Sequence, residues 1–154
     1  MKKLILASLC LVFLTGCTKK TATETSCTIS DATDSYSDVL LADNDRVTSS
    51  VTTSVTNFSK AIEDGSITAT NLALEVEALS TALNAIPGVT YTSSIENNVL
   101  TDSTTIDYKE ADMDSLIAEG LIQGDPDAYL NFLSLSETVS NYEELGLTCT
   151  TNKR

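Results

Sequence analysis

The sequence predicts a mainly α-helical domain, a small up-and-down bundle of three to four helices. Two observations lead to this prediction. Apolar residues recur at steps of three, four or seven over several long stretches, which is the spacing of one helix face. Short connections and strong helix-start and helix-end signals separate these stretches. Residues 89–105 fit this pattern least and are expected to be irregular or to form a weak β-hairpin.

The first predicted helix extends from about Asp31 to Asp64. Carboxylates suit its start, where they cap free amides and meet the positive end of the helix dipole, and Gly65 suits its end. Asp43-Asn44-Asp45 interrupts the apolar pattern, so either one long helix contains a polar notch or two helices meet there, and we favour one helix. The side chains that share the predicted face are Tyr36, Leu40, Val47, Val51, Val55, Phe58 and Ile62.

A second helix is predicted over about residues 72–86, with Thr68 or Asn71 as its cap and Pro87-Gly88 as its end. Its apolar residues step by four and three: Leu72, Val76, Leu79, Leu83 and Ile86. Because only residues 64–67 separate it from the first helix, the two are expected to form an antiparallel hairpin.

The next stretch, residues 89–105, is rich in Thr, Ser and β-branched residues. Val89-Thr90-Tyr91 alternates as a strand does, and Asn97-Asn98 suits a turn. Apolar residues of the same stretch also fit a helical face, so both possibilities stay open.

Two further helices are predicted towards the C-terminus. A short one covers about residues 107–119 and ends at Gly120. A longer one starts at Asp125-Pro126, an acidic cap followed by proline at the first helical position, and ends near Gly146.

The N-terminal 17 residues form a separate unit. Lys2 and Lys3 precede an apolar run, residues 4–14, that is shorter than the roughly 20 residues needed to span a bilayer. This is the pattern of a secretory signal peptide, and it argues against the alternative of a buried core helix.

The signal ends in Leu14-Thr15-Gly16-Cys17, which resembles the lipobox of bacterial lipoproteins. The resemblance covers residues 1–17 and implies that Cys17 is lipidated and that the chain is cut before it. Two or three acyl chains, palmitate among them, would anchor the domain stably. Thr18 stands where an aspartate would resemble an inner-membrane retention signal, so the resemblance favours the outer membrane. The expected organisation is a signal at residues 1–16, a lipidated flexible tether at 17–30 and an acidic helical domain at 31–150.

The acidic composition limits the choice of partners. Loss of Lys2 and Lys3 with the signal changes the formal net charge from −13 to −15. A field of that sign repels nucleic acid and attracts cationic proteins or divalent ions, although solubility alone also explains it.

Two cysteines, Cys27 and Cys149, remain after Cys10 is removed and Cys17 is lipidated. They lie near the two ends of the domain, in an oxidising compartment, and a disulfide between them is the simplest account. Free thiols or bonds to other chains are the alternatives.

Catalytic groups are scarce. The chain has no histidine, no nucleophile motif, no phosphate-binding glycine loop and no zinc-binding spacing, so we expect neither an enzyme nor a cofactor. Two acidic clusters are weak candidates for metal binding, although a solvated acidic face is the favoured explanation of both. The smaller contains Asp43 and Asp45, and the larger contains Asp107, Glu110, Asp112 and Asp114.

The sequence therefore favours a non-catalytic, membrane-anchored envelope lipoprotein that acts as a protein-binding or structural module. The alternative is a periplasmic inhibitor or immunity-type protein that neutralises a basic enzyme or toxin. An acidic cation-binding protein is a third reading. The apolar helix faces fit either a bundle core or a groove for a partner helix or lipid.

Overall fold

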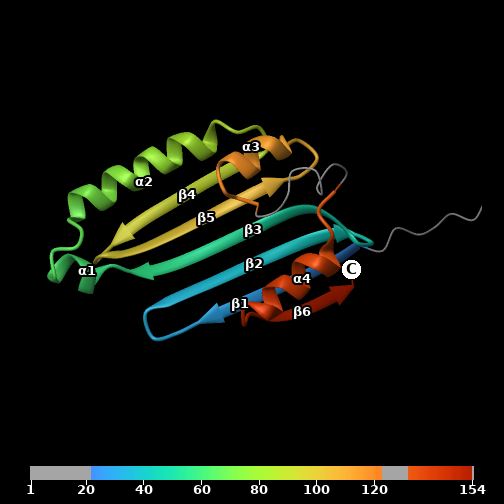
Figure 1. Cartoon of the computed structure of the whole chain (residues 1–154), viewed down its shortest axis with the longest axis horizontal. Helices are drawn as coiled ribbons and strands as arrows, with labels where there is room; N and C mark the ends of the chain where they lie inside the picture. Colours follow the sequence, from blue (N-terminus) through green and yellow to red (C-terminus); the bar gives the residue numbers. More distant parts are fainter. Residues whose placement is uncertain (1–21, 123–131, 154) are drawn as a thin grey trace, which may run out of the picture.

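The structure, a computed structural model, describes residues 22–122 and 132–153, which form an antiparallel sheet of six strands accompanied by four helices (Figure 1). The strands are β1 (Ala22–Ser30), β2 (Asp34–Asp43), β3 (Arg46–Asn57), β4 (Val89–Glu96), β5 (Val99–Asp107) and β6 (Thr148–Lys153). The helices are α1 (Ser59–Glu63), α2 (Ala69–Asn84), α3 (Met113–Ala118) and α4 (Leu135–Glu144). The order across the sheet is β4-β5-β3-β2-β1-β6. The predicted helical bundle is therefore wrong.

The largest error concerns residues 31–64, where β2 and β3 replace the predicted helix. A step of four is even, so residues four apart share one face of a strand as well as one face of a helix. Asp43-Asn44-Asp45, interpreted as a notch in a helix, is the turn between the two strands, and Asn44 has a positive φ of 57°. A β-bulge after Leu41 then moves the valines of β3 between faces.

The hairpin that the sequence left open for residues 89–105 does form. Strands β4 and β5 pair in register from Val89 opposite Ile106 to Glu96 opposite Val99. Asn97 and Asn98 make the turn with φ values of 52° and 64°, as a two-residue type I′ turn requires.

The second predicted helix is present as α2. Thr68 is its cap and accepts a hydrogen bond of 3.1 Å from the Asn71 amide. The last two predicted helices are shorter in the structure. The described part of the final one is α4, which begins at Leu135 after the Ser134 cap, whereas the predicted start at Asp125-Pro126 lies outside the described residues.

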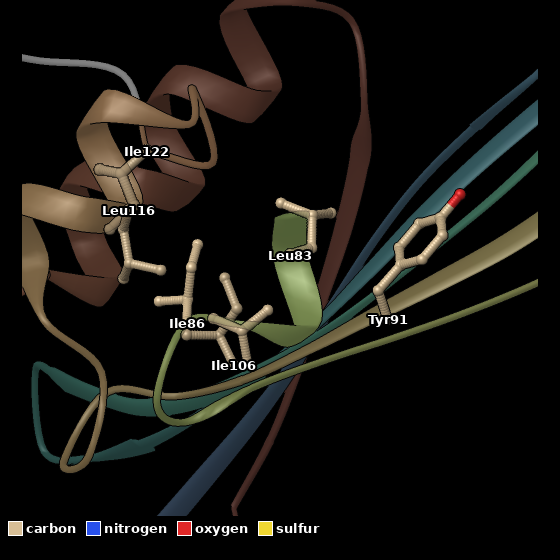
Figure 2. Packing of buried hydrophobic residues seen from close by; sticks show 7 residues of the cluster. Leu83, Ile86, Tyr91, Ile106, Leu116 and Ile122 are labelled. Atoms are coloured by element: carbon tan, nitrogen blue, oxygen red, sulfur yellow. The ribbon is translucent and has the colours of Figure 1, made fainter. Parts of the chain in front are cut away.

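Helices α2, α3 and α4 pack on one face of the sheet, in two clusters. The first cluster joins α2 and α3 to β4 and β5 (Figure 2) and contains Leu83, Ile86, Val89, Tyr91, Ile106, Leu116 and Ile122. The second joins α4 to β2 and β3 and contains Leu40, Ala42, Val47 and Leu135. Burying one such large side chain stabilises the fold by about 1.5–3 kcal/mol.

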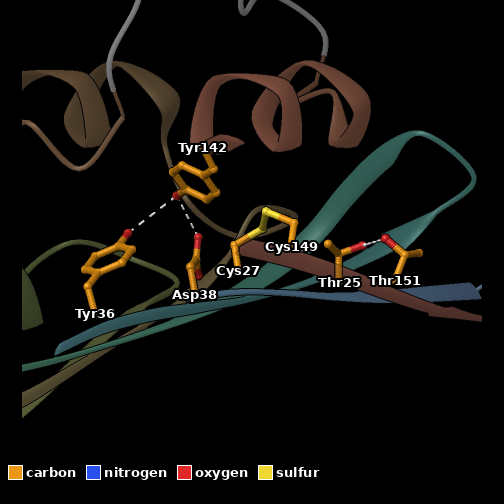
Figure 3. Close-up of a disulfide and its surroundings, with 7 residues drawn as sticks. All are labelled: Thr25, Cys27, Tyr36, Asp38, Tyr142, Cys149 and Thr151. Carbon is orange, nitrogen blue, oxygen red and sulfur yellow. Dashed lines mark hydrogen bonds between the residues drawn. A yellow bond between two sulfur atoms is a disulfide. The ribbon is translucent and has the colours of Figure 1, made fainter. Parts of the chain in front are cut away.

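The predicted disulfide between Cys27 and Cys149 is confirmed. It joins β1 to the edge strand β6 at directly opposed positions (Figure 3). β1 itself occupies residues that the sequence assigns to a flexible tether, so from Ala22 onward that prediction is wrong. Alternating Thr, Ser and Cys side chains made this segment look unstructured, although hydroxyl-rich, β-branched residues suit a strand.

No helix among the described residues is long and apolar enough to cross a membrane.

Candidate ligand-binding pocket

A pocket of about 500 Å³ lies between α4, β2 and the segment that follows α3. Its polar lining contains Tyr36, Asp38, Tyr108, Thr138, Asn141 and Tyr142. Its remaining lining contains Ile29, Leu40, Gly120, Leu121, Ile122, Leu133, Leu145 and Leu147. A concave, largely apolar site with a few convergent polar groups is the usual form of a small-ligand pocket.

Strand β2 supplies the floor of the pocket. Tyr36, Asp38 and Leu40 alternate along the strand, so all three side chains point to the face that the helices cover. The alternation places the Asp38 carboxylate between an aromatic and an aliphatic side chain on that face.

The turn between β2 and β3 holds α4 over this floor. Asp45 accepts hydrogen bonds of 2.8 Å from the Ser134 hydroxyl and from the Ser136 amide, and its carbonyl accepts one of 2.8 Å from the Leu135 amide. The Ser136 amide is the main cause of the lowered pKa of the Asp45 carboxyl. These bonds fix the first turn of α4, which in turn places Tyr142 above β2.

Asp38 is the central polar group of the pocket, with only 2% of its surface exposed. The Tyr142 hydroxyl donates to its Oδ2 at 2.7 Å (Figure 3). The Thr52 hydroxyl donates to its Oδ1 at 3.2 Å. Burial raises the pKa of the Asp38 carboxyl, and the two donors oppose that rise. Within the described chain no Lys or Arg forms an ion pair with Asp38.

Three tyrosines surround this carboxylate. The rings of Tyr36 and Tyr142 meet edge to face, with centroids 6.4 Å apart, and their hydroxyl oxygens are 3.5 Å apart. The Tyr108 hydroxyl forms a hydrogen bond of 3.1 Å with the Ser50 hydroxyl. Burial raises the pKa of Tyr108 to about 12 and raises that of Tyr142 as well. All three hydroxyls are therefore protonated at neutral pH and act as hydrogen-bonding groups rather than as nucleophiles.

Cys27 and Cys149 lie outside the pocket lining. Cys17, the predicted lipidation site, precedes the described residues. Cys27 is opposite Asp38 in the pairing of β1 with β2. The disulfide to Cys149 therefore links the edge strand β6 to β1 at a position next to the pocket.

The acidic cluster at residues 107–114 has local structural roles in the described chain. Asp112 caps α3 and accepts hydrogen bonds from the amide and the hydroxyl of Ser115, while Asp107 accepts one from the Lys109 amide. Asp114 lies in the first turn of α3, where its charge favours the helix dipole. No group of three potential metal ligands gathers here or elsewhere among the residues that the structure describes.

The pocket residues themselves were missed from the sequence. Tyr36 and Leu40 belong to the helix face predicted for residues 31–64, and Asp38 lies away from that face in a helix. Interpreting the same residues as a strand would have placed Asp38 on the apolar face, where a lone carboxylate is unusual.

No protein-family model and no curated protein matches this chain. Among solved structures, it is similar to the NMR structure of a protein from Streptococcus pneumoniae TIGR4, with 16% identity, a TM-score of 0.56 and 97% of each chain covered. It is also similar to the NMR structure of the Escherichia coli YehR protein, with 16% identity, a TM-score of 0.64, and 86% of this chain and 91% of that chain covered. At this identity the likeness concerns the fold alone.

Proposed function

We propose that this chain is a non-catalytic lipoprotein of the bacterial envelope, anchored through Cys17, that binds a ligand in the pocket between α4 and β2. The observation that best supports a binding role is that Asp38, Tyr36 and Tyr142 all line one cavity of about 500 Å³. The groups in this pocket are suited to recognition, because the tyrosines remain protonated and the carboxylate is held by two hydroxyl donors.

The anchor is supported by the lipobox-like Leu14-Thr15-Gly16-Cys17 and is compatible with where the sheet begins. β1 starts at Ala22, five residues after Cys17, and five extended residues reach at most about 17 Å. The end of the sheet that carries Ala22 would therefore lie against the membrane.

Basic side chains favour the same orientation. Of the four basic residues in the described part of the chain, three lie at the end of the sheet that contains Ala22: Arg46, Lys109 and Lys153. They would face anionic headgroups, while the opposite end of the sheet would project away from the membrane.

Lipidation is tested by replacing Cys17 with serine in a bacterial host and measuring the mass of the product. The wild type is expected to be cut before Cys17, to carry acyl chains and to sediment with membranes. Cys17→Ser is expected to lose all three properties, and Cys10→Ser, a matched change inside the signal, is expected to keep them. A Cys17→Ser product that is still cut at the same bond and still sediments with membranes would refute the anchor.

Ligand binding is tested by blocking the mouth of the pocket. Asn141 is exposed and lines the pocket, whereas its neighbour Ser140 is exposed and does not line it. Protein purified from the envelope would be extracted and analysed by mass spectrometry for bound small molecules and peptides. Asn141→Trp is expected to lose the ligand that the wild type and Ser140→Trp retain. Equal loads on all three proteins, or none on any of them, would contradict a binding role for this pocket.

An inhibitor of a basic enzyme or toxin remains a second candidate because of one feature of the charge distribution. The turns farthest from Ala22 gather acidic residues, which include Asp31, Asp34, Glu96 and Asp64. Such an end would steer a cationic protein, and the association rate would fall steeply as salt rises. A rate of association with basic lytic enzymes that does not depend on salt would remove this candidate.

A further inference from the structure

Asp38 is a buried carboxylate whose two side-chain hydrogen-bond partners are both uncharged. Tyr142 and Thr52 each donate one hydroxyl, and within the described residues no cationic side chain neutralises the charge. Buried charges in proteins are normally paired, because hydroxyl donors replace only part of the lost hydration. The pocket thus contains a negative charge that the described protein itself leaves uncompensated.

The surroundings of this charge suit a cation with an organic body. Tyr36 and Tyr142 line the same cavity, and aromatic rings attract cations to their faces. Leu121, Leu133 and Leu145 give the pocket apolar sides against which alkyl groups can pack. A hydrated metal ion would gain nothing from these side chains, whereas an alkylammonium group would use both the carboxylate and the apolar walls.

We propose that the pocket binds an organic cation, a primary or quaternary ammonium group on a small apolar body, with the charge of its nitrogen facing Asp38. This inference rests on the proposed function, since it names the class of ligand for the same pocket. The formal net charge of −15 expected after removal of the signal would raise the local concentration of such ligands.

The cation is tested with two probes of nearly equal shape. Choline carries a quaternary ammonium, and 3,3-dimethylbutan-1-ol replaces that nitrogen with carbon. Each is titrated into the full mature lipoprotein in a non-ionic detergent. Tyrosine fluorescence can follow binding, since the chain has no tryptophan and three of the four tyrosines that the structure describes line the pocket. Choline is expected to bind at least about tenfold more tightly than the alcohol.

Variants of the protein test whether the Asp38 carboxylate causes the preference for choline. Asp38→Asn keeps the size of the side chain and is expected to abolish the preference while leaving the affinity for the alcohol unchanged. Asp102→Asn is the matched control, because Asp102 is a half-buried aspartate on the same face of the sheet that does not line the pocket, and it is expected to keep the preference. If Asp38→Asn does not fold, Tyr142→Phe removes one donor to Asp38 and is expected to increase the preference for the cation, because the carboxylate is then less compensated. An unchanged or smaller preference would count against Asp38 as the group that the cation faces.

A second pair of probes distinguishes the two sources of such a cation. The tripeptide Gly-Lys-Gly is compared with its norleucine analogue, and tighter binding of the lysine peptide than of choline would identify a peptide side chain as the ligand. The reverse order would identify a small amine.

The outcomes also separate this inference from the proposed function. Equal affinities for choline and the alcohol would overturn the proposal that the ligand is a cation, but would still allow the pocket to bind a ligand. A preference that survives in Asp38→Asn would likewise overturn it. If neither choline nor the lysine peptide binds, the proposal of a cationic ligand is overturned. The envelope extraction with Asn141→Trp then decides separately whether the pocket binds another ligand.

Discussion

Removal of the Cys27–Cys149 disulfide should destabilise the domain strongly. The bond joins residues 122 positions apart and so closes almost the whole domain into one loop. In the chain-entropy model a loop of this length destabilises the unfolded state by about 4–5 kcal/mol. We therefore expect the double variant Cys27→Ala/Cys149→Ala to lose several kcal/mol of unfolding free energy and about 10–20 °C of melting temperature.

The assay is urea denaturation of the mature chain, followed by far-UV circular dichroism, with and without the disulfide. Cys27 is fully buried, so its replacement by alanine also leaves a small cavity that adds to the loss. Thr25→Val is a suitable comparison, because it removes the neighbouring 2.8 Å hydroxyl contact with Thr151 and keeps the covalent link. It should cost about 1 kcal/mol. A double cysteine variant that loses less unfolding free energy than Thr25→Val would refute the reasoning.

Three further predictions concern single positions. Asn84→Ala should lose about 1–3 kcal/mol in urea denaturation, because the Asn84 amide bonds both the N–H and the C=O of Tyr91 on the edge strand β4, whereas Ser80→Ala should have little effect. Gly88→Ala should lower the melting temperature more than Gly65→Ala. Both glycines have positive φ, but a Cβ at Gly88 would lie 2.7 Å from the Ala111 amide nitrogen and one at Gly65 meets open space. Asp38→Asn should flatten the change of stability with pH. Burial raises the folded-state pKa of Asp38, so stability falls as pH rises through that pKa and recovers on mild acidification, and the variant should lose this recovery in melting scans between about pH 4 and 7. A variant with the wild-type pH profile would contradict that sign.

The sequence predicted the elements whose signals do not depend on the choice between helix and strand. Thr68, Pro87 and Gly88 bound α2 as expected, and the two cysteines of the domain are paired. These signals come from local backbone chemistry and from the number of cysteines, which tertiary structure rarely overrides.

The fold class was missed because its main evidence was ambiguous. In β3 the residues Val47, Val51 and Val55 are four apart, a spacing that strands and helices both allow. The abundance of Thr and Val in this stretch favours a strand over a helix, since β-branched residues favour strands. The bulge after Leu41 could not be read from the sequence, yet it decides which of these valines faces the helices.

The pocket depends on contacts between distant parts of the chain, which no local pattern contains. Tyr142 reaches Asp38 across 104 residues, and Tyr108 reaches Ser50 across 58. The first pair exists because α4 lies over β2, and the second because β5, which Tyr108 follows, pairs with β3. The site therefore became visible only when the sheet was known.

A carbon-detected NMR titration of the Asp38 carboxyl group shows whether this residue supplies a buried negative charge for a cationic ligand. The account predicts that the Asp38 pKa lies above the ordinary aspartate value in the free protein, because burial raises it. It also predicts that choline lowers this pKa, because a nearby cation favours the charged carboxylate. An ordinary pKa that choline does not change would contradict the account.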